Sequence, residues 1–158
     1  MLPLVLLMTQ LALTVMTAAC AVNDHAAGRH REPAATYSTD PQLIHRALAF
    51  GGIVLPGGAE VLAAGVDSGI DTRYQLALQM SPSELITLLA ESHFDAPFTE
   101  AHPPFITVIT GPALKSSPRV LRAQDRYRSP TGPSVYRTVI IDERAPEIRI
   151  VHLSMFTT

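Results

Sequence analysis

Apolar residues fill the first nineteen positions of the chain almost without a break, and only threonine and glutamine interrupt them. A run of this length and character is typical of a signal-peptide core or a short membrane span. The segment that follows, residues 20–39, is small and polar and shows no periodicity. We therefore predict a flexible tether over residues 20–39, ahead of a folded domain that occupies residues 40–158.

Two stretches of the domain carry the pattern of capped helices. Asp40 followed by Pro41 is a typical helix start, and Gly51–Gly52 is a typical end. In "SPSELITLLAES", Ser81 can cap the helix while Glu84, three residues later, completes a capping box. Apolar residues recur at helical spacing in both stretches, at Leu43, Ile44, Ala47 and Leu48 in the first and at Leu85, Leu88 and Leu89 in the second.

Strand patterns precede and follow the second helix. "EVLAAGV" and "TRYQLALQM" are predicted to pair across "DSGID", and in the second of them apolar and polar residues alternate. Near the end, two β-branched runs flank "DERAPE" as strands flank a turn. Between residues 95 and 134 prolines interrupt every run except "FITVIT", a short candidate strand, so this region is expected to be rich in loops.

The order of these elements predicts the fold class. Helix, two strands, helix, loops and two strands fit an α+β domain. We expect a small antiparallel sheet of about four to five strands, with two helices packed on one face and a proline-rich loop region at 95–134.

Charge and cysteine content exclude several classes of protein. The chain has 12 Lys and Arg against 14 Asp and Glu, a formal net charge of -2, and so lacks the basic excess of nucleic-acid binders. A single cysteine excludes an intramolecular disulfide and a multi-cysteine zinc site. We expect a monomer with no cofactor, no metal and no nucleic-acid partner.

That single cysteine, Cys20, ends the apolar run directly after Ala18 and Ala19. "TAAC" resembles the lipobox of bacterial lipoproteins, although Thr17 stands where leucine is preferred and no Lys or Arg precedes the run. The resemblance implies that residues 1–19 are a signal peptide, that Cys20 carries a diacylglyceryl group, and that the lipid holds the protein on the extracytoplasmic face of the cell membrane. The two ordered halves also resemble small actinobacterial lipoproteins of the Streptomyces type, a resemblance that implies an envelope location and no particular activity.

Two alternatives to lipidation remain open. The apolar run can instead be an uncleaved signal anchor, in which case Arg29 and Arg31 place the domain in the cytoplasm by the positive-inside rule. An ordinary signal peptidase can also cut at the alanine-rich end, and Cys20 is then lost or free.

Candidate catalytic groups are few and scattered. Asp67 in "DSG" resembles the aspartic-protease triplet, yet the same residues suit a hairpin turn. Asp71 lies in the same connection, and His93 and His102 bracket Asp95 and Glu100 in a proline-broken segment, where they form a weak metal pattern. We interpret His152 as a half-buried strand histidine whose hydrogen bonds are satisfied.

A basic stretch gives the candidate binding residues. If "KSSPRVLRAQDRYR" were helical, Arg119, Arg122 and Arg126 would share one face and could contact anionic headgroups or an acidic partner; the alternative is a solvated loop. These observations predict a lipid-anchored envelope protein that binds an envelope protein or a small ligand and does not catalyse. A small extracytoplasmic hydrolase that uses Asp67, Asp71 or the His93 region is the competing hypothesis.

Overall fold

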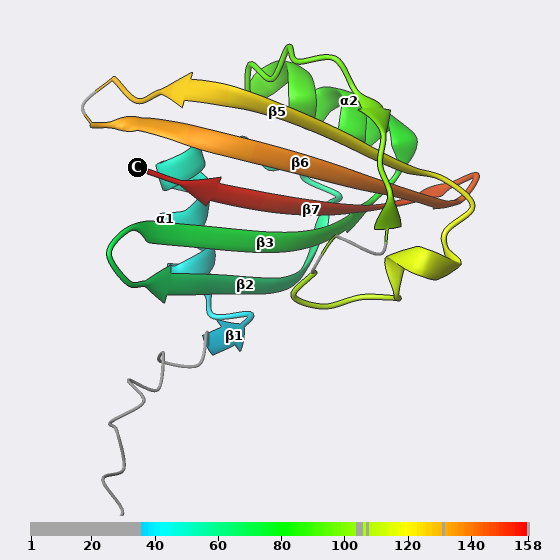
Figure 1. The fold of residues 1–158 in the computed structure, drawn as a ribbon, viewed down its shortest axis with the longest axis horizontal. Helices are drawn as coiled ribbons and strands as arrows, with labels where there is room; N and C mark the ends of the chain where they lie inside the picture. The colour runs from blue at the N-terminus through cyan, green and yellow to red at the C-terminus, as the bar shows by residue number, and fades with distance from the viewer. Residues whose placement is uncertain (1–35, 104–105, 107, 131, 158) are drawn as a thin grey trace, which may run out of the picture. The chain divides into compact units, whose positions relative to one another are not determined.

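The computed structural model describes residues 36–103, 106, 108–130 and 132–157. In this part of the chain, one antiparallel sheet of seven strands has the order β1-β2-β3-β7-β6-β5-β4, and two α-helices accompany it (Figure 1). The elements are β1 (Thr36–Ser38), α1 (Pro41–Gly51), β2 (Glu60–Ser68), β3 (Thr72–Met80), α2 (Pro82–Glu91), β4 (Thr99–Glu100), the 3-10 helix η2 (Leu114–Ser116), β5 (Val120–Arg128), β6 (Ser134–Ala145) and β7 (Ile148–Phe156). The α+β class is therefore confirmed.

Both helices begin at the caps that the sequence predicts. The Asp40 carboxylate accepts hydrogen bonds from the backbone N–H of Gln42 and Leu43, at 3.2 and 3.3 Å. In α2 the Ser81 N–H donates to Glu84 Oε2 at 2.7 Å, and the Glu84 N–H donates to Ser81 Oγ at 3.3 Å. These reciprocal bonds satisfy N–H groups that a helix start otherwise leaves without partners.

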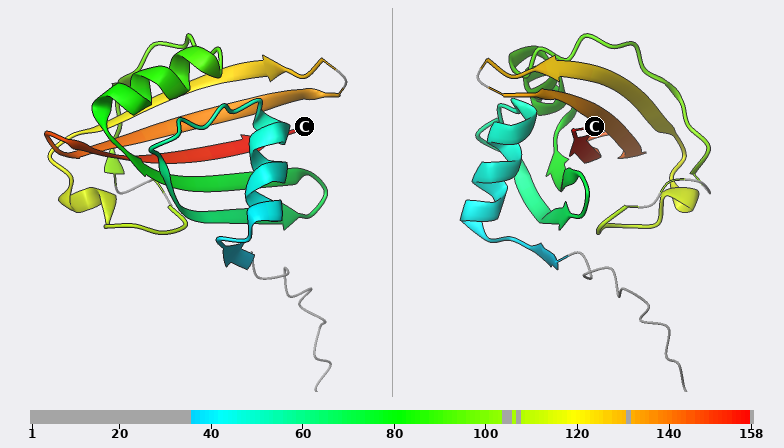
Figure 2. Two further views of the ribbon diagram at one scale, coloured as in Figure 1. Left: turned by 180° about the vertical axis from the view of Figure 1, so that it is seen from behind. Right: turned by 60° about the vertical axis from the view of Figure 1, so that its left-hand side comes forward.

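The two helices cover the same face of the sheet, as the view from behind shows (Figure 2). Alternate residues of each central strand point to this face and pack against the helices, as the period of two requires. The resulting core is apolar, with members from β3, β6, β7 and both helices such as Leu76, Val139, Leu153, Leu88 and Ala47. This layer matches the predicted packing of two helices on one face.

The number of strands was predicted wrongly. The sheet has seven strands and not four to five, because β5 runs through the region expected to be loop-rich and the short strands β1 and β4 complete the edges. Strand β1 also lies inside the segment 20–39 assigned to the tether. The described residues of "FITVIT" are not in a strand, and the turn in "DERAPE" is reduced to Pro146 and Glu147, since β6 continues to Ala145.

The opposite face carries no helix of the described chain, and we call it the helix-free face. The connection between β4 and β5, which contains η2, folds over one end of this face (Figures 1 and 2). There Leu114 packs with Val120 and Ile140, against Ala101, Ile106 and Val108. The other end of the face, near the C-terminus and the β2–β3 turn, lies beyond this cover.

The described residues contain no helix that is long and apolar enough to span a membrane. The predicted signal peptide, Cys20 and the alternative signal anchor all lie outside the described residues.

Candidate functional site

The arginines of the folded part divide into two groups. Arg119, Arg137, Arg144 and Arg149 each have a carboxylate partner at ion-pair distance. Among the described residues no carboxylate stands at that distance from the remaining arginines, which are Arg46 on α1, Arg73 on β3, and Arg122, Arg126 and Arg128 on β5. The second group contains the charges that remain available to a partner.

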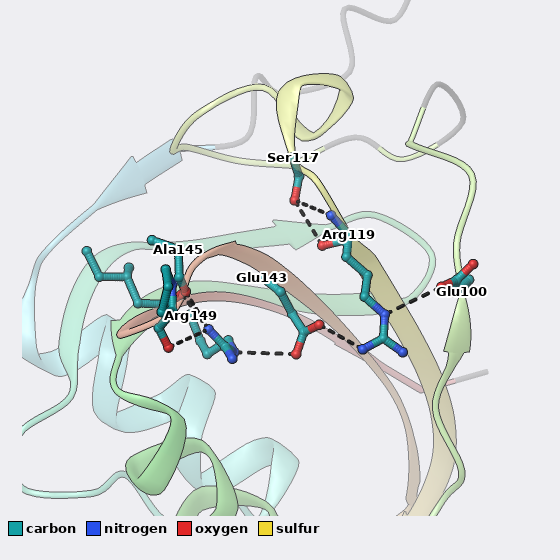
Figure 3. A network of polar contacts seen from close by, with 8 residues as sticks. Glu100, Ser117, Arg119, Glu143, Ala145 and Arg149 are labelled. Atoms are coloured by element: carbon teal, nitrogen blue, oxygen red, sulfur yellow. Dashed lines mark hydrogen bonds and ion pairs between the residues drawn. The ribbon is translucent and has the colours of Figure 1, made fainter.

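Arg119 belongs to the paired group, so the predicted trio of arginines is not a single surface. Its guanidinium lies between two carboxylates, with Nη1 3.0 Å from Glu143 Oε2 and Nε 3.4 Å from Glu100 Oε1 (Figure 3). Glu143 also pairs with Arg149, which donates to the Ala145 carbonyl. This network ties the start of β5 to the β6–β7 turn, and we assign it to structure.

Arg122 and Arg126 do share a face, but on a strand and not on a helix. Residues 120–128 form β5, so the two side chains lie four residues apart on one side of the sheet, and Arg128 joins them on that side. All three side chains are exposed and lie on the helix-free face. For residues 120–128 both sequence interpretations, helix and solvated loop, were therefore wrong, whereas residues 117–119 are a loop.

A row of four stacked side chains crosses this face beside Arg128. The strand register places Arg73, Phe156, Tyr136 and Arg126 next to one another on β3, β7, β6 and β5. The two rings stack with centroids 5.5 Å apart, and each outer guanidinium carbon stands over the neighbouring ring, at 5.8 Å for Arg73 and 5.1 Å for Arg126. These cation–π contacts attract each guanidinium to its ring, and no carboxylate of the described chain stands at ion-pair distance from it, so its N–H groups can bind a carboxylate or phosphate.

We call Arg73, Arg122, Arg126 and Arg128 the face arginines. Two carboxylates lie near them, neither at ion-pair distance from a face arginine: Asp67 of β2 stands opposite Arg73 in the strand register, and Glu100 of β4 lines one hollow with Arg122 but pairs with Arg119. Strand β5 carries no acid on this face, since its only carboxylate, Asp125, binds Arg137 on the other side of the sheet. The β5 end of the face is therefore cationic, and negatively charged groups are attracted to it.

Next to the stacked row lies a small pocket. Its lining contains three polar side chains, Gln75, Ser154 and His152, and otherwise apolar residues: Leu76, Ile140 and Leu153 of the sheet, and Val108 and Ile109 of the β4–β5 connection. The volume open to the centre of a water-sized group is about 20 Å³. Because a single water needs roughly 10–15 Å³ by this measure, the pocket can receive one small group of a ligand but cannot enclose a whole molecule.

His152 differs from its prediction as a satisfied, half-buried residue. Only 5% of it is exposed, and neither ring nitrogen has a hydrogen-bond partner in the described chain. Burial lowers its pKa to about 4 against an opposing attraction from Asp142, so the imidazole is neutral at pH 7. A neutral ring offers one donor and one acceptor to whatever enters the pocket.

The β4–β5 connection, which contributes to the pocket, is held by a partly buried ion pair between Arg144 and Asp142. Asp142 is fully buried and its Oδ2 accepts from Arg144 Nη2 at 2.7 Å. Arg144 also donates to the Ala113 carbonyl and to Ser116 Oγ, at 3.0 and 2.9 Å. These contacts fasten η2 to the sheet beside the pocket.

The structure disperses the other sequence candidates. Asp67 and Ser68 are the last two residues of β2 and pair with Arg73 and Thr72, whereas Gly69 and Asp71 lie in the turn to β3. "DSG" is therefore the end of one hairpin strand and the start of its turn. His93 follows α2, where its carbonyl accepts from Arg137, whereas His102 lines a separate open hollow with Glu100 and Arg122. No cluster of three or more His, Cys, Asp or Glu side chains suited to a metal is found among the residues that the structure describes.

Sequence reasoning missed most of this site. Arg73, Tyr136, Phe156 and Arg128 come together only through the register of four strands, which no local pattern reveals. The available signal was the alternation Arg73-Gln75-Gln79 in the second predicted strand, which correctly identified a face with polar side chains.

Comparisons of the chain with known protein families, with curated protein sequences and with solved structures found no match. The site therefore has to be interpreted from its own geometry and chemistry.

Proposed function

We propose that this protein is a binding module of the cell envelope, held at the membrane by a lipid on Cys20, and that its helix-free face binds an anionic partner. The observation that carries this proposal is the set of face arginines without ion-pair carboxylates, two of which stack on aromatic rings. A guanidinium fixed by stacking loses less conformational entropy when it binds a carboxylate or phosphate than a free one does.

Their spacing favours an extended partner over a small ion. Three strand spacings separate Arg73 from Arg126, about 14 Å, and four residues along β5 separate Arg122 from Arg126, about 13 Å. A single carboxylate can reach neighbours such as Arg126 and Arg128 but cannot contact all four face arginines, whereas a chain of anionic groups can. Binding modules commonly present such contacts on a rigid scaffold.

The test measures the affinity of the full-length protein, kept in a nonionic detergent, for fluorescently labelled polygalacturonate and polyglutamate. The triple variant Arg122→Gln/Arg126→Gln/Arg128→Gln is expected to bind at least one of these polyanions about tenfold more weakly at low salt. The difference is expected to shrink at high salt, because screening already weakens the charge term.

Two control variants test whether binding depends on the helix-free face or only on the overall charge of the protein. Arg46→Gln removes an exposed arginine from the helix-covered side and should leave the affinity unchanged. Asp67→Asn removes the acid beside Arg73 and should not weaken binding, whereas turnover in a hydrolase panel that disappears in Asp67→Asn would support the competing enzyme hypothesis. If the wild type binds neither polyanion and no anionic vesicle, or if the triple variant binds as well as the wild type, the proposed function is wrong.

The anchor is tested separately, on the cysteine that ends the apolar run. Labelled fatty acid is expected to enter the wild-type protein in a lipoprotein-processing bacterium and not the Cys20→Ser variant, since the thiol is the acceptor. Equal labelling of the two proteins, or none of the wild type, contradicts lipidation at Cys20.

A further inference from the structure

Three polar side chains that line the small pocket of the helix-free face have no hydrogen-bond partner in the described chain. In the described chain the side chains of Gln75, Ser154 and His152 make no hydrogen bond, and all three line the small pocket beside the stacked row. Neighbouring polar residues of the same face behave differently: Gln124 donates to Thr138 at 2.8 Å, and Gln79 donates to Glu60 at 3.5 Å. Among the buried side-chain atoms of the described residues, those without a partner are Asp142 Oδ1 and the two ring nitrogens of His152, and only the ring lines the pocket.

The chemistry of these side chains selects the group that fits. An amide, a hydroxyl and a neutral imidazole each combine donor and acceptor capacity. Their complement is a group that both donates and accepts, such as a hydroxyl, whereas a carboxylate or phosphate only accepts. An unpaired buried polar group is costly, so a ligand hydroxyl that pairs with a buried ring nitrogen of His152 gains binding free energy, and the half-buried Gln75 and Ser154 can add further hydrogen bonds.

The pocket and the arginines are close enough to act on one ligand. Gln75 and Ser154 lie two residues along their strands from Arg73 and Phe156, a step of about 7 Å. A ligand that uses both sites must carry hydroxyl and anionic groups within about this distance of one another. A chain of sugar acids has this property, because each ring bears several hydroxyls and a charged group.

Resting on the proposed function above, we propose that the anionic partner is an acidic polysaccharide, with its charged groups on the face arginines and a sugar hydroxyl in the pocket of Gln75, Ser154 and His152. An acidic peptide supplies the charges but few hydroxyls. A flat anionic bilayer also supplies the charges, but its headgroups lie in one plane, whereas the hydroxyl has to enter a pocket that Val108 and Ile109 of the β4–β5 connection also line.

The test compares polygalacturonate with polyglutamate and with phosphatidylglycerol vesicles on the same full-length protein. The double variant Gln75→Met/Ser154→Ala keeps the size of the glutamine and every charge, and removes no hydrogen bond seen in the described chain. It is expected to weaken binding of polygalacturonate about tenfold and to change binding of polyglutamate less than twofold.

The matched control is Gln79→Met, on the same strand and the same face but outside the pocket. It should change neither affinity by more than about twofold. An unchanged thermal midpoint in the double variant shows that its effect on binding does not arise from unfolding.

The outcomes separate this inference from the function on which it rests. Equal affinities for polygalacturonate and polyglutamate, both unaffected by Gln75→Met/Ser154→Ala, would overturn the polysaccharide assignment while the anionic face stands. Binding to the vesicles but to neither soluble polymer would overturn it in favour of a membrane surface. No binding to any of the three probes would overturn the proposed function as well.

Discussion

Each face of the sheet holds an arginine beside an aromatic ring, but the two arginines differ in whether other groups of the chain bind their N–H groups. On the helix-covered face Arg137 is 1% exposed and lies between the rings of Phe94 and Tyr127, at 5.3 and 5.1 Å. On the helix-free face Arg126 is exposed and stands over one ring, that of Tyr136. Both guanidinium groups are fixed by aromatic stacking, but only the first is surrounded by acceptors.

Every N–H of Arg137 is occupied. It forms a two-pronged ion pair with Asp125, and it donates to the carbonyls of Gly51, Ser92 and His93. These carbonyls lie at the C-terminal ends of α1 and α2, where backbone acceptors have no partner within the helix. Arg137 thus fastens both helices to the sheet, whereas in the described chain no carboxylate pairs with Arg126. A stacked arginine therefore serves folding where acceptors surround it and remains available for binding where they do not.

Replacement of the buried arginine should have the largest effect. Arg137→Leu leaves the Asp125 carboxylate and three carbonyls without their donor, so we expect a loss of about 3–5 kcal/mol in the free energy of unfolding. Urea denaturation measures it. Arg126→Gln is the matched control on the other face, and its change should stay within about 0.5 kcal/mol. A similar loss of unfolding free energy in the two variants would mean that the arginines of the two faces contribute equally to folding.

A smaller effect is expected from pH, through the histidine of the pocket. The pKa of His152 is about 4 in the folded protein and about 6.5 in the unfolded chain. Between these values the unfolded chain binds the proton, so stability is highest above pH 6.5 and falls as the pH decreases toward 4, by about 3 kcal/mol in all.

The charged groups near this ring are few. Asp142 on β6 attracts the protonated form and is itself bound by Arg144, while the residues of β3 and of the cover that line the pocket carry no charge. The comparison of denaturation midpoints at pH 7 and pH 4.5 should therefore show a decrease that is smaller in His152→Gln than in the wild type. The same decrease in both proteins would assign the pH dependence to other groups.

The comparison of the faces also explains what the sequence could predict. The two helices were recognisable because their caps are local, at Asp40 and Ser81, and the β2–β3 hairpin because its alternation is regular. Strand β5 was missed because Asp125 occupies a position that faces the core, where a strand pattern calls for an apolar residue. Its partner Arg137 is twelve residues away on β6, so the ion pair that permits the acid there cannot be seen in the local pattern.

The site was harder to predict for a related reason. Arg122 and Arg126 were named on the assumption of a helix, and the correct reason for their shared face is the period of two in a strand. Arg119 is separated from them by its contacts with Glu100 and Glu143, which depend on β4 and β6. Strands β1 and β4, with three and two residues, are too short to show any period.

The position of β7 in the middle of the sheet has a consequence for the order of folding. Strand β3 pairs with β7, so that Leu76 stands beside Leu153, and the carbonyl that Arg137 binds in Gly51 lies 86 residues earlier in the chain. Contacts between such distant segments require large loops to close before they contribute stability, and this slows folding. A nascent chain that has not yet reached β6 lacks both the strand that completes the centre of the sheet and the arginine that holds the helices. The native arrangement of this domain can therefore form only after its last elements have been synthesised.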